Sequence, residues 1–110
     1  MKANELRIGN LILKENTEIK VTASTLMDMQ NKDSDYYSPI PLTEEWLLKF
    51  GFEKSYPDGE DGWPWWTLNY VELVDYGDEL EYNVTDRQFK YVHTLQNLYF
   101  ALTGEELQIS

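Results

Sequence analysis

The chain has 110 residues, including 20 Asp or Glu and 9 Lys or Arg, so its formal net charge is −11. Nucleic-acid phosphates and anionic membrane surfaces bind clustered basic residues, so this balance argues against both kinds of partner. The absence of cysteine excludes disulfide bonds, zinc–thiolate sites and a cysteine nucleophile.

We expect a single domain, residues 1–110, because domains commonly hold about 100–150 residues. Hydrophobic residues make up 42% of the chain, which is enough to form a core. Residues 1–10 lack the apolar run of a secretory signal, and no stretch approaches the roughly 20 apolar residues that span a bilayer. These features predict a cytoplasmic protein.

The first third of the chain reads as short strands. We expect strands over residues 6–13 and 18–22, joined by a turn at Glu15 and Asn16, because apolar residues alternate with polar ones. A third strand is expected over residues 24–29, and the polar residues 30–38 are expected to form a loop. The opening pair of strands resembles the start of a small SH3-like barrel.

Two helices and a hairpin follow. A helix is predicted over residues 44–50, because Thr43 suits the N-cap and Gly51 suits the stop. A second is predicted over residues 94–102, where apolar residues recur at helical spacing. Residues 65–74 are expected to form one strand or two, and residues 64–75 and 79–84 are expected to pair as a hairpin. The fold class is therefore α+β, with a small antiparallel sheet packed on two short helices.

Residues 55–86 contain no Lys or Arg, although three of the four tryptophans and four of the eight tyrosines lie there. A solvated surface normally mixes both signs of charge, because like charges on neighbouring strands repel. The stretch nevertheless holds nine carboxylates: Asp58, Glu60, Asp61, Glu72, Asp75, Asp78, Glu79, Glu81 and Asp86.

This stretch is a candidate binding surface for a basic protein. A field of one sign speeds association with a basic partner, and exposed Trp and Tyr supply apolar anchors. The alternative, in which the tryptophans form the core and the acids only keep the chain in solution, stays open. Trp65 and Trp66 cannot both enter a one-sided core, since adjacent strand residues face opposite sides. The predicted contact residues are Asp58, Glu60, Asp61, Trp63, Trp65, Trp66, Asp75, Tyr76, Asp78, Glu79 and Glu81.

Signals for catalysis are weak. Asp58, Glu60 and Asp61 partly match a calcium loop but lack its ligand spacing. Paired carboxylates of the glycosidase kind occur in any acidic hairpin and therefore indicate little. His93 is the only histidine, and no nucleophile elbow or glycine-rich phosphate loop is present. We expect no catalytic residue, metal or cofactor.

Two segments carry a resemblance: residues 39–52, PIPLTEEWLLKFGF, and residues 91–107, YVHTLQNLYFALTGEEL. Together with residues 6–10, LRIGN, they are similar to a family of small uncharacterised proteins of Bacteroidota phages, prophages and mobile elements. The similarity covers about half of the chain and both predicted helices. It supplies no activity and no catalytic residues. It implies an accessory protein of a mobile element, acting inside a bacterial cell.

Small acidic phage proteins often look like inhibitors of host nucleic-acid machinery, because their carboxylates occupy grooves built for phosphate. We therefore expect a non-enzymatic protein that binds a basic protein surface, such as an RNA-guided CRISPR nuclease, without contacting nucleic acid or membrane. In that role it would be an anti-CRISPR-like inhibitor. The alternative is a structural or accessory module that binds another protein through apolar surfaces of its helices.

Overall fold

The computed structural model describes residues 3–30, 36–57, 59–69, 71–76, 80–82 and 87–109, with the backbone alone for residues 82 and 87–89. Within these ranges the chain forms two antiparallel sheets and three α-helices. The predicted α+β class is confirmed. The expectation of one sheet and two helices is wrong in number, because the N-terminal strands form a sheet of their own and an additional helix follows them.

The first sheet has the strand order β2-β1-β3, from β1 (Leu11–Lys14), β2 (Thr17–Lys20) and β3 (Tyr37–Ser38). The tip of the β1–β2 hairpin is the predicted pair Glu15 and Asn16, whose φ angles are 49° and 69°. Two successive positive φ angles match the twist of a tight two-residue hairpin turn. The likeness to an SH3-like barrel stays a prediction.

Three predicted boundaries in this part are wrong. The strand expected over residues 6–13 begins only at Leu11, because a 3-10 turn, η1 (Ala3–Glu5), and a turn at Gly9 with φ 100° come first. The strand expected over residues 18–22 starts and ends earlier, at Thr17 and Lys20. Of the loop expected over residues 30–38, residues 31–35 lie outside the described residues, and the last two residues form β3.

Residues 24–29, predicted as a strand, belong to helix α1 (Ala23–Met29). The hydroxyl of Thr22 accepts a hydrogen bond from the Thr25 backbone N–H, at 3.3 Å. The hydroxyl of Thr25 accepts one from the Thr22 N–H, at 3.2 Å. This reciprocal capping satisfies N–H groups at the start of the helix. Two β-branched residues that favour a strand by propensity therefore serve here as a helix cap.

Helix α2 (Glu44–Lys49) confirms the helix predicted over residues 44–50. The Thr43 hydroxyl accepts a hydrogen bond from the Trp46 backbone N–H, at 3.4 Å, and Gly51 has the positive φ expected after a helix. The second sheet follows, with the strand order β4-β5-β6-β7-β8. Its strands are β4 (Glu53–Ser55), β5 (Trp65–Leu68), β6 (Val71–Asp75), β7 (Leu80–Tyr82) and β8 (Arg87–Phe89).

The hairpin predicted between residues 64–75 and 79–84 corresponds to three strands. A turn at Asn69, with φ 55°, divides the first predicted arm into β5 and β6. The second arm is β7, and residues 79, 83 and 84 lie outside the described residues. The predicted pairing of β6 with β7 is therefore confirmed, and of the two alternatives for the first arm, one strand or two, the structure shows two.

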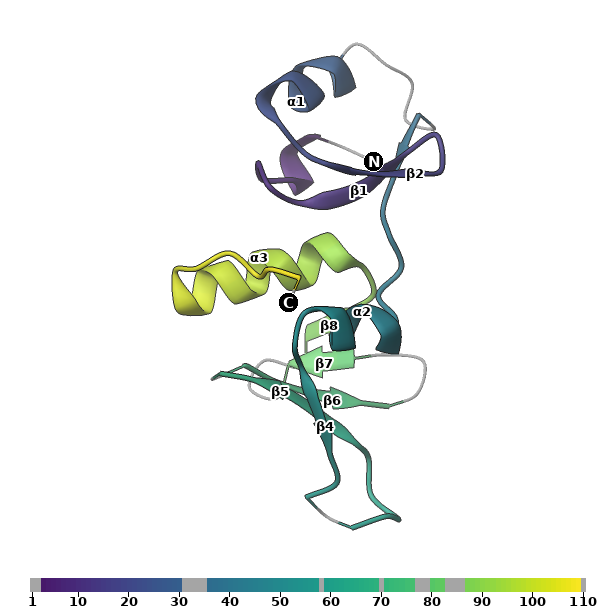
Figure 1. Cartoon of the computed structure of the whole chain (residues 1–110), viewed down its shortest axis with the longest axis vertical. Helices are drawn as coiled ribbons and strands as arrows, with labels where there is room; N and C mark the ends of the chain where they lie inside the picture. The colour runs from purple at the N-terminus through teal and green to yellow at the C-terminus, as the bar shows by residue number, and fades with distance from the viewer. Residues whose placement is uncertain are drawn as a thin grey trace.

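Helix α3 (Val92–Thr103) lies between the two sheets (Figure 1). It begins two residues before the predicted range 94–102, with Tyr91 at the N-cap, and ends one residue after it, with Gly104 at the C-cap in the left-handed conformation, φ 75°. Its apolar side packs on the second sheet and α2 in the main core cluster. That cluster consists of Ile40, Trp46, Leu47, Phe50, Phe52, Trp66, Val71, Leu73, Leu80, Val92, Leu95, Tyr99 and Leu107.

A second, smaller core lies within the N-terminal sheet, where Leu6, Ile12, Val21 and Tyr37 are buried. The two cores lie on opposite sides of α3, which gives the described chain an elongated shape of 49 × 27 × 25 Å. The connection between β4 and β5 projects away from α3, at the bottom of Figure 1. Residues 55–86, in which all charged side chains are acidic, thus belong to the second sheet, which α3 separates from the N-terminal sheet.

Candidate functional site

The register of the second sheet assigns its residues to two faces. Trp65 pairs with Val74, and Val74 pairs in turn with Glu81, whereas Trp66 pairs with Leu73. Because residues directly opposite one another share a face and neighbours along a strand alternate, Trp65 and Trp66 lie on opposite faces. The inner face contacts the helices through the main core cluster. We call the other one the outer face.

Trp66 is on the inner face and is fully buried. Its indole Nε1 donates a hydrogen bond to Oδ2 of Asp75 across the β5–β6 hairpin, at 3.1 Å. A buried indole needs such an acceptor, since an unpaired N–H away from water is costly. Trp66 was predicted to contact a partner, and its burial excludes this role. Asp75, another predicted contact residue, also lies on the inner face, where its carboxylate accepts the hydrogen bond of Trp66.

Val74 is buried, with 6% of its surface exposed, although it belongs to neither core cluster. It lies on the outer face opposite Trp65, which is half-buried. A hydrogen bond from Asp75 N–H to the carbonyl of Pro64, at 2.9 Å, continues the β5–β6 pairing by one residue. The continued register brings the predicted contact residues Trp63 and Tyr76 opposite each other.

Trp63 and Tyr76, which we call the aromatic pair, contact each other edge to face, with ring centroids 5.2 Å apart and planes at 70°. Both rings remain open to solvent, at 55% and 40% exposed. Edge-to-face contact is a favourable arrangement for aromatic rings, so each ring holds the other in place. Tryptophan side chains are on average largely buried in folded proteins, so a tryptophan that is more than half exposed is unusual.

Carboxylates lie on the same face of the sheet as the aromatic pair and in the connection that carries Trp63. Glu60 and Asp61 are exposed in the β4–β5 connection, Glu72 is exposed on the outer face, and Glu81 is half-buried beside Val74. The nearest described lysine, Lys54, pairs with Trp66 and therefore lies on the inner face. The predicted contact residues Asp58, Asp78 and Glu79, together with Asp86, lie outside the described residues.

A polar network between α3 and the N-terminal hairpin was not predicted. Oε1 of the buried Gln96 accepts a hydrogen bond from the Leu11 backbone N–H, at 2.8 Å. Asn97 Oδ1 accepts from Asn10 Nδ2, at 2.9 Å, and from the Arg7 guanidinium, at 2.8 Å. The hydrogen-bonded partners lie about 90 residues apart along the chain, so no local pattern predicts their contact. The one indication in the sequence is the pair of adjacent amide side chains, Gln96 and Asn97, in a segment with helical spacing.

His93 is buried at the start of α3, and its ring stacks on Tyr91 at 5.9 Å between centroids. Its Nδ1 has no hydrogen-bond partner among the residues that the structure describes. Burial lowers the pKa of His93 below its usual 6.5, an effect that the charge of Glu5 partly offsets. The observed role of His93 is therefore packing at the start of α3.

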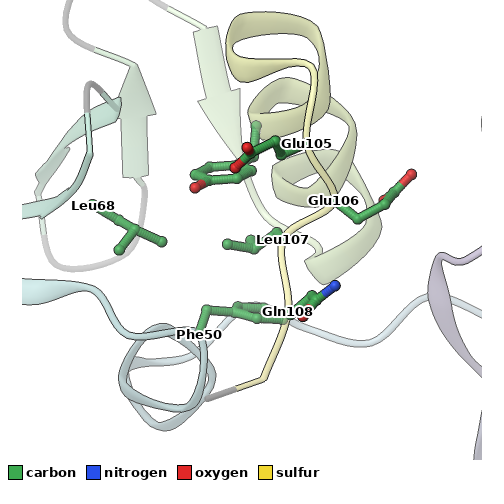
Figure 2. Close-up of a pocket in the computed structure, with 7 residues that line it drawn as sticks. Phe50, Leu68, Glu105, Glu106, Leu107 and Gln108 are labelled. Atoms are coloured by element: carbon green, nitrogen blue, oxygen red, sulfur yellow. The ribbon is translucent and has the colours of Figure 1, made fainter.

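A cavity of about 530 Å³ lies beside the C-terminal tail, which we define as residues 105–109. Figure 2 shows the side chain of Leu107 directed from the tail toward Leu68 and Phe50. The hydroxyl of Tyr99, which also lines this cavity, already accepts a hydrogen bond from Asn69 Nδ2, at 2.5 Å. Glu105 and Glu106 also line the cavity.

The described residues contain no cluster of three or more His, Asp or Glu side chains arranged to hold a metal ion. No helix in the described ranges is both long and apolar enough to cross a bilayer. Comparisons with protein-family models, curated proteins and solved structures found no match for this chain. The resemblance noted from the sequence stays a prediction, and function has to be argued from the surface itself.

Proposed function

We propose that the chain is a non-enzymatic binding protein whose outer face docks on a basic surface of another protein. The observation that carries this proposal is the aromatic pair, in which two large exposed rings contact each other on a face that also carries carboxylates. Exposed Trp and Tyr are the side chains that most often dominate protein interfaces. The surrounding charge of one sign steers basic partners toward them and repels acidic ones.

The finer version of the proposal is an anti-CRISPR-like inhibitor of an RNA-guided, RNA-cleaving nuclease. Two observations support it. The acidic outer face carries charge of the same sign as phosphates, so it is complementary to a basic groove that binds them. The sequence also resembles small proteins of mobile elements. In this version the chain occupies the groove in place of RNA and contacts protein only.

A charge-reversal experiment tests the proposal. Glu60, Glu72 and Glu81 are changed together to Lys, and cleavage of a labelled, guide-matched RNA by a purified Bacteroidota nuclease is followed against inhibitor concentration. The wild-type chain should inhibit, and the triple variant should need at least about tenfold more protein, because charge complementarity at an interface becomes repulsion. Its thermal midpoint should stay unchanged or rise slightly, since the net charge moves toward zero.

The matched control reverses three exposed carboxylates away from the outer face: Glu15, Glu18 and Glu105. Both triple variants change the net charge equally, so a general attraction between the proteins would weaken both. Inhibition that survives in the control and fails in the first variant supports the outer face. Equal inhibition by both variants and the wild type contradicts it. Absence of inhibition by the wild type contradicts a nuclease of this class as the partner.

The second candidate function is docking through the helices, and it is favoured by exposed apolar residues there. Leu48 on α2 is 57% exposed, and Leu102 on α3 is 45% exposed. Apolar contacts depend little on salt, whereas contacts between surface charges are screened beyond about 8–10 Å at physiological ionic strength. Binding that is insensitive both to added salt and to the outer-face triple variant would indicate this alternative.

A further inference from the structure

Four aromatic rings elsewhere in the described part of this protein lie beside one of its own cations, and two of these rings, Tyr56 and Phe100, are exposed. The Arg7 guanidinium lies 4.0 Å from the ring centre of Phe100, and Lys49 Nζ lies 4.6 Å from that of Trp46. Two more pairs have the same arrangement at 5.5 and 5.8 Å: Lys14 over Tyr36 and Lys54 over Tyr56. Each is within the distance at which a cation is attracted to an aromatic face.

The aromatic pair differs from all of these. Among the described residues no Lys or Arg lies over Trp63 or Tyr76, although Trp63 is among the most exposed rings of the chain. The sequence is consistent with the difference, because residues 55–86, which include both rings, contain no Lys or Arg, and Lys54 on the neighbouring β4 lies on the inner face. The carboxylates of Glu60 and Asp61, in the same connection, attract a cation to this position.

We propose that the aromatic pair is a binding site for an arginine side chain of the partner protein. The guanidinium stacks on the Trp63 ring, against the second wall formed by Tyr76 at 70°, and pairs with a carboxylate of the β4–β5 connection. This inference rests on the proposed function and deepens it, since it names the side chain that the outer face recognises.

Arginine suits this site better than lysine for two physical reasons. Its guanidinium is planar and weakly hydrated, so it stacks on an indole with little loss of solvation, whereas an ammonium is compact and strongly hydrated. It also donates hydrogen bonds in its own plane, so it can stack on a ring and pair with a carboxylate at once. The aromatic pair offers the ring, and Glu60 or Asp61 offers the carboxylate.

The experiment compares three synthetic peptides that are identical except at four positions, which carry arginine, lysine or uncharged citrulline. Binding to the full chain is followed by NMR, through the indole N–H signals of the tryptophans. We expect the arginine peptide to bind more tightly than the lysine peptide, and the citrulline peptide to bind weakest. Changing Trp63 to Ala should weaken the arginine peptide about two- to fivefold, the range for a solvent-exposed cation–π contact, and should remove its advantage over lysine.

The matched control is Tyr56→Ala, which removes another exposed ring of the same sheet end that already lies under Lys54. It should leave the preference for arginine unchanged. Far-UV circular dichroism checks that both variants fold, which is expected because both side chains are largely in solvent.

The possible outcomes separate this inference from the proposed function. Equal binding of arginine and lysine peptides, unaffected by Trp63→Ala, overturns the arginine site. If the outer-face triple variant still abolishes that binding, the acidic docking surface survives the result. No binding of any peptide overturns the arginine site. Loss of the arginine preference in Tyr56→Ala, with Trp63→Ala unaffected, also overturns it, by placing the site on another ring.

Discussion

Trp63 and Trp66 lie three residues apart and have opposite environments. Trp66 is enclosed in the main core and its indole is bound by Asp75, whereas Trp63 is held in solvent by Tyr76. Alternation along a strand predicted that Trp65 and Trp66 would separate, because it depends only on local geometry. It did not predict which one is buried, since that depends on the face that the helices cover. The contact of Trp63 with Tyr76 depends on the register of β5 and β6.

At the same scale, His93 makes stability depend on pH. Its pKa is lowered by burial in the folded chain, while an unfolded histidine titrates near 6.5. Below pH 6.5 the unfolded chain therefore binds a proton at this residue more readily than the folded chain does. The free energy of unfolding consequently decreases as the pH falls from 6.5 toward the lowered pKa of the folded state. Above pH 6.5 both states are neutral at this residue, and the contribution is constant.

The comparison of wild type with His93→Phe isolates this effect, since His93 is the only histidine and Phe keeps a ring to stack on Tyr91. Urea unfolding is measured at intervals from pH 7.5 to pH 5. The free energy of unfolding of the wild type should fall relative to that of the variant over this range. A constant difference between the two proteins would show that His93 does not titrate differently on folding.

At the scale of elements, the sequence predicted those with strong local signals. Helix α2 has a capping threonine, acidic residues in its first turn and a terminal glycine, and its predicted range is correct to one residue. Helix α1 was missed because it has no fully buried residue and therefore a weak apolar pattern. The division of the strands between two sheets was missed for another reason: it is fixed by α3, which packs against both parts from the far end of the chain.

The cap of α1 gives a prediction at this scale. Thr22→Ala removes the hydroxyl that accepts the hydrogen bond from the Thr25 backbone N–H, but it keeps the bond from the Thr22 N–H to the Thr25 hydroxyl. Loss of an N-cap side chain costs about 1 kcal/mol. Urea unfolding at neutral pH measures the loss. The control is Ser24→Ala in the first turn of the same helix, which should be neutral or slightly stabilising because alanine is the better helix former. A Thr22→Ala chain as stable as the wild type would contradict the role of the cap.

At the scale of the whole molecule, charge and aromatic side chains are divided between the two ends. Residues 1–38 hold six carboxylates and five basic residues, whereas residues 39–110 hold 14 carboxylates and four basic residues. The negative field is therefore concentrated on the half of the chain that contains the outer face. A net charge of −11 by itself indicates only a general preference for basic partners. Its uneven distribution, together with the aromatic pair, points to a particular face.

Hydroxyl-radical footprinting of the chain, alone and mixed with the nuclease that we propose as its partner, tests this central claim most directly. Oxidation of each side chain is read by mass spectrometry with and without the partner. We predict that oxidation falls at Trp63 and Tyr76 on binding and stays unchanged at Leu48 and Leu102, which are exposed on the helices. Protection of Leu48 and Leu102, with Trp63 and Tyr76 as reactive as in the free chain, would contradict the account.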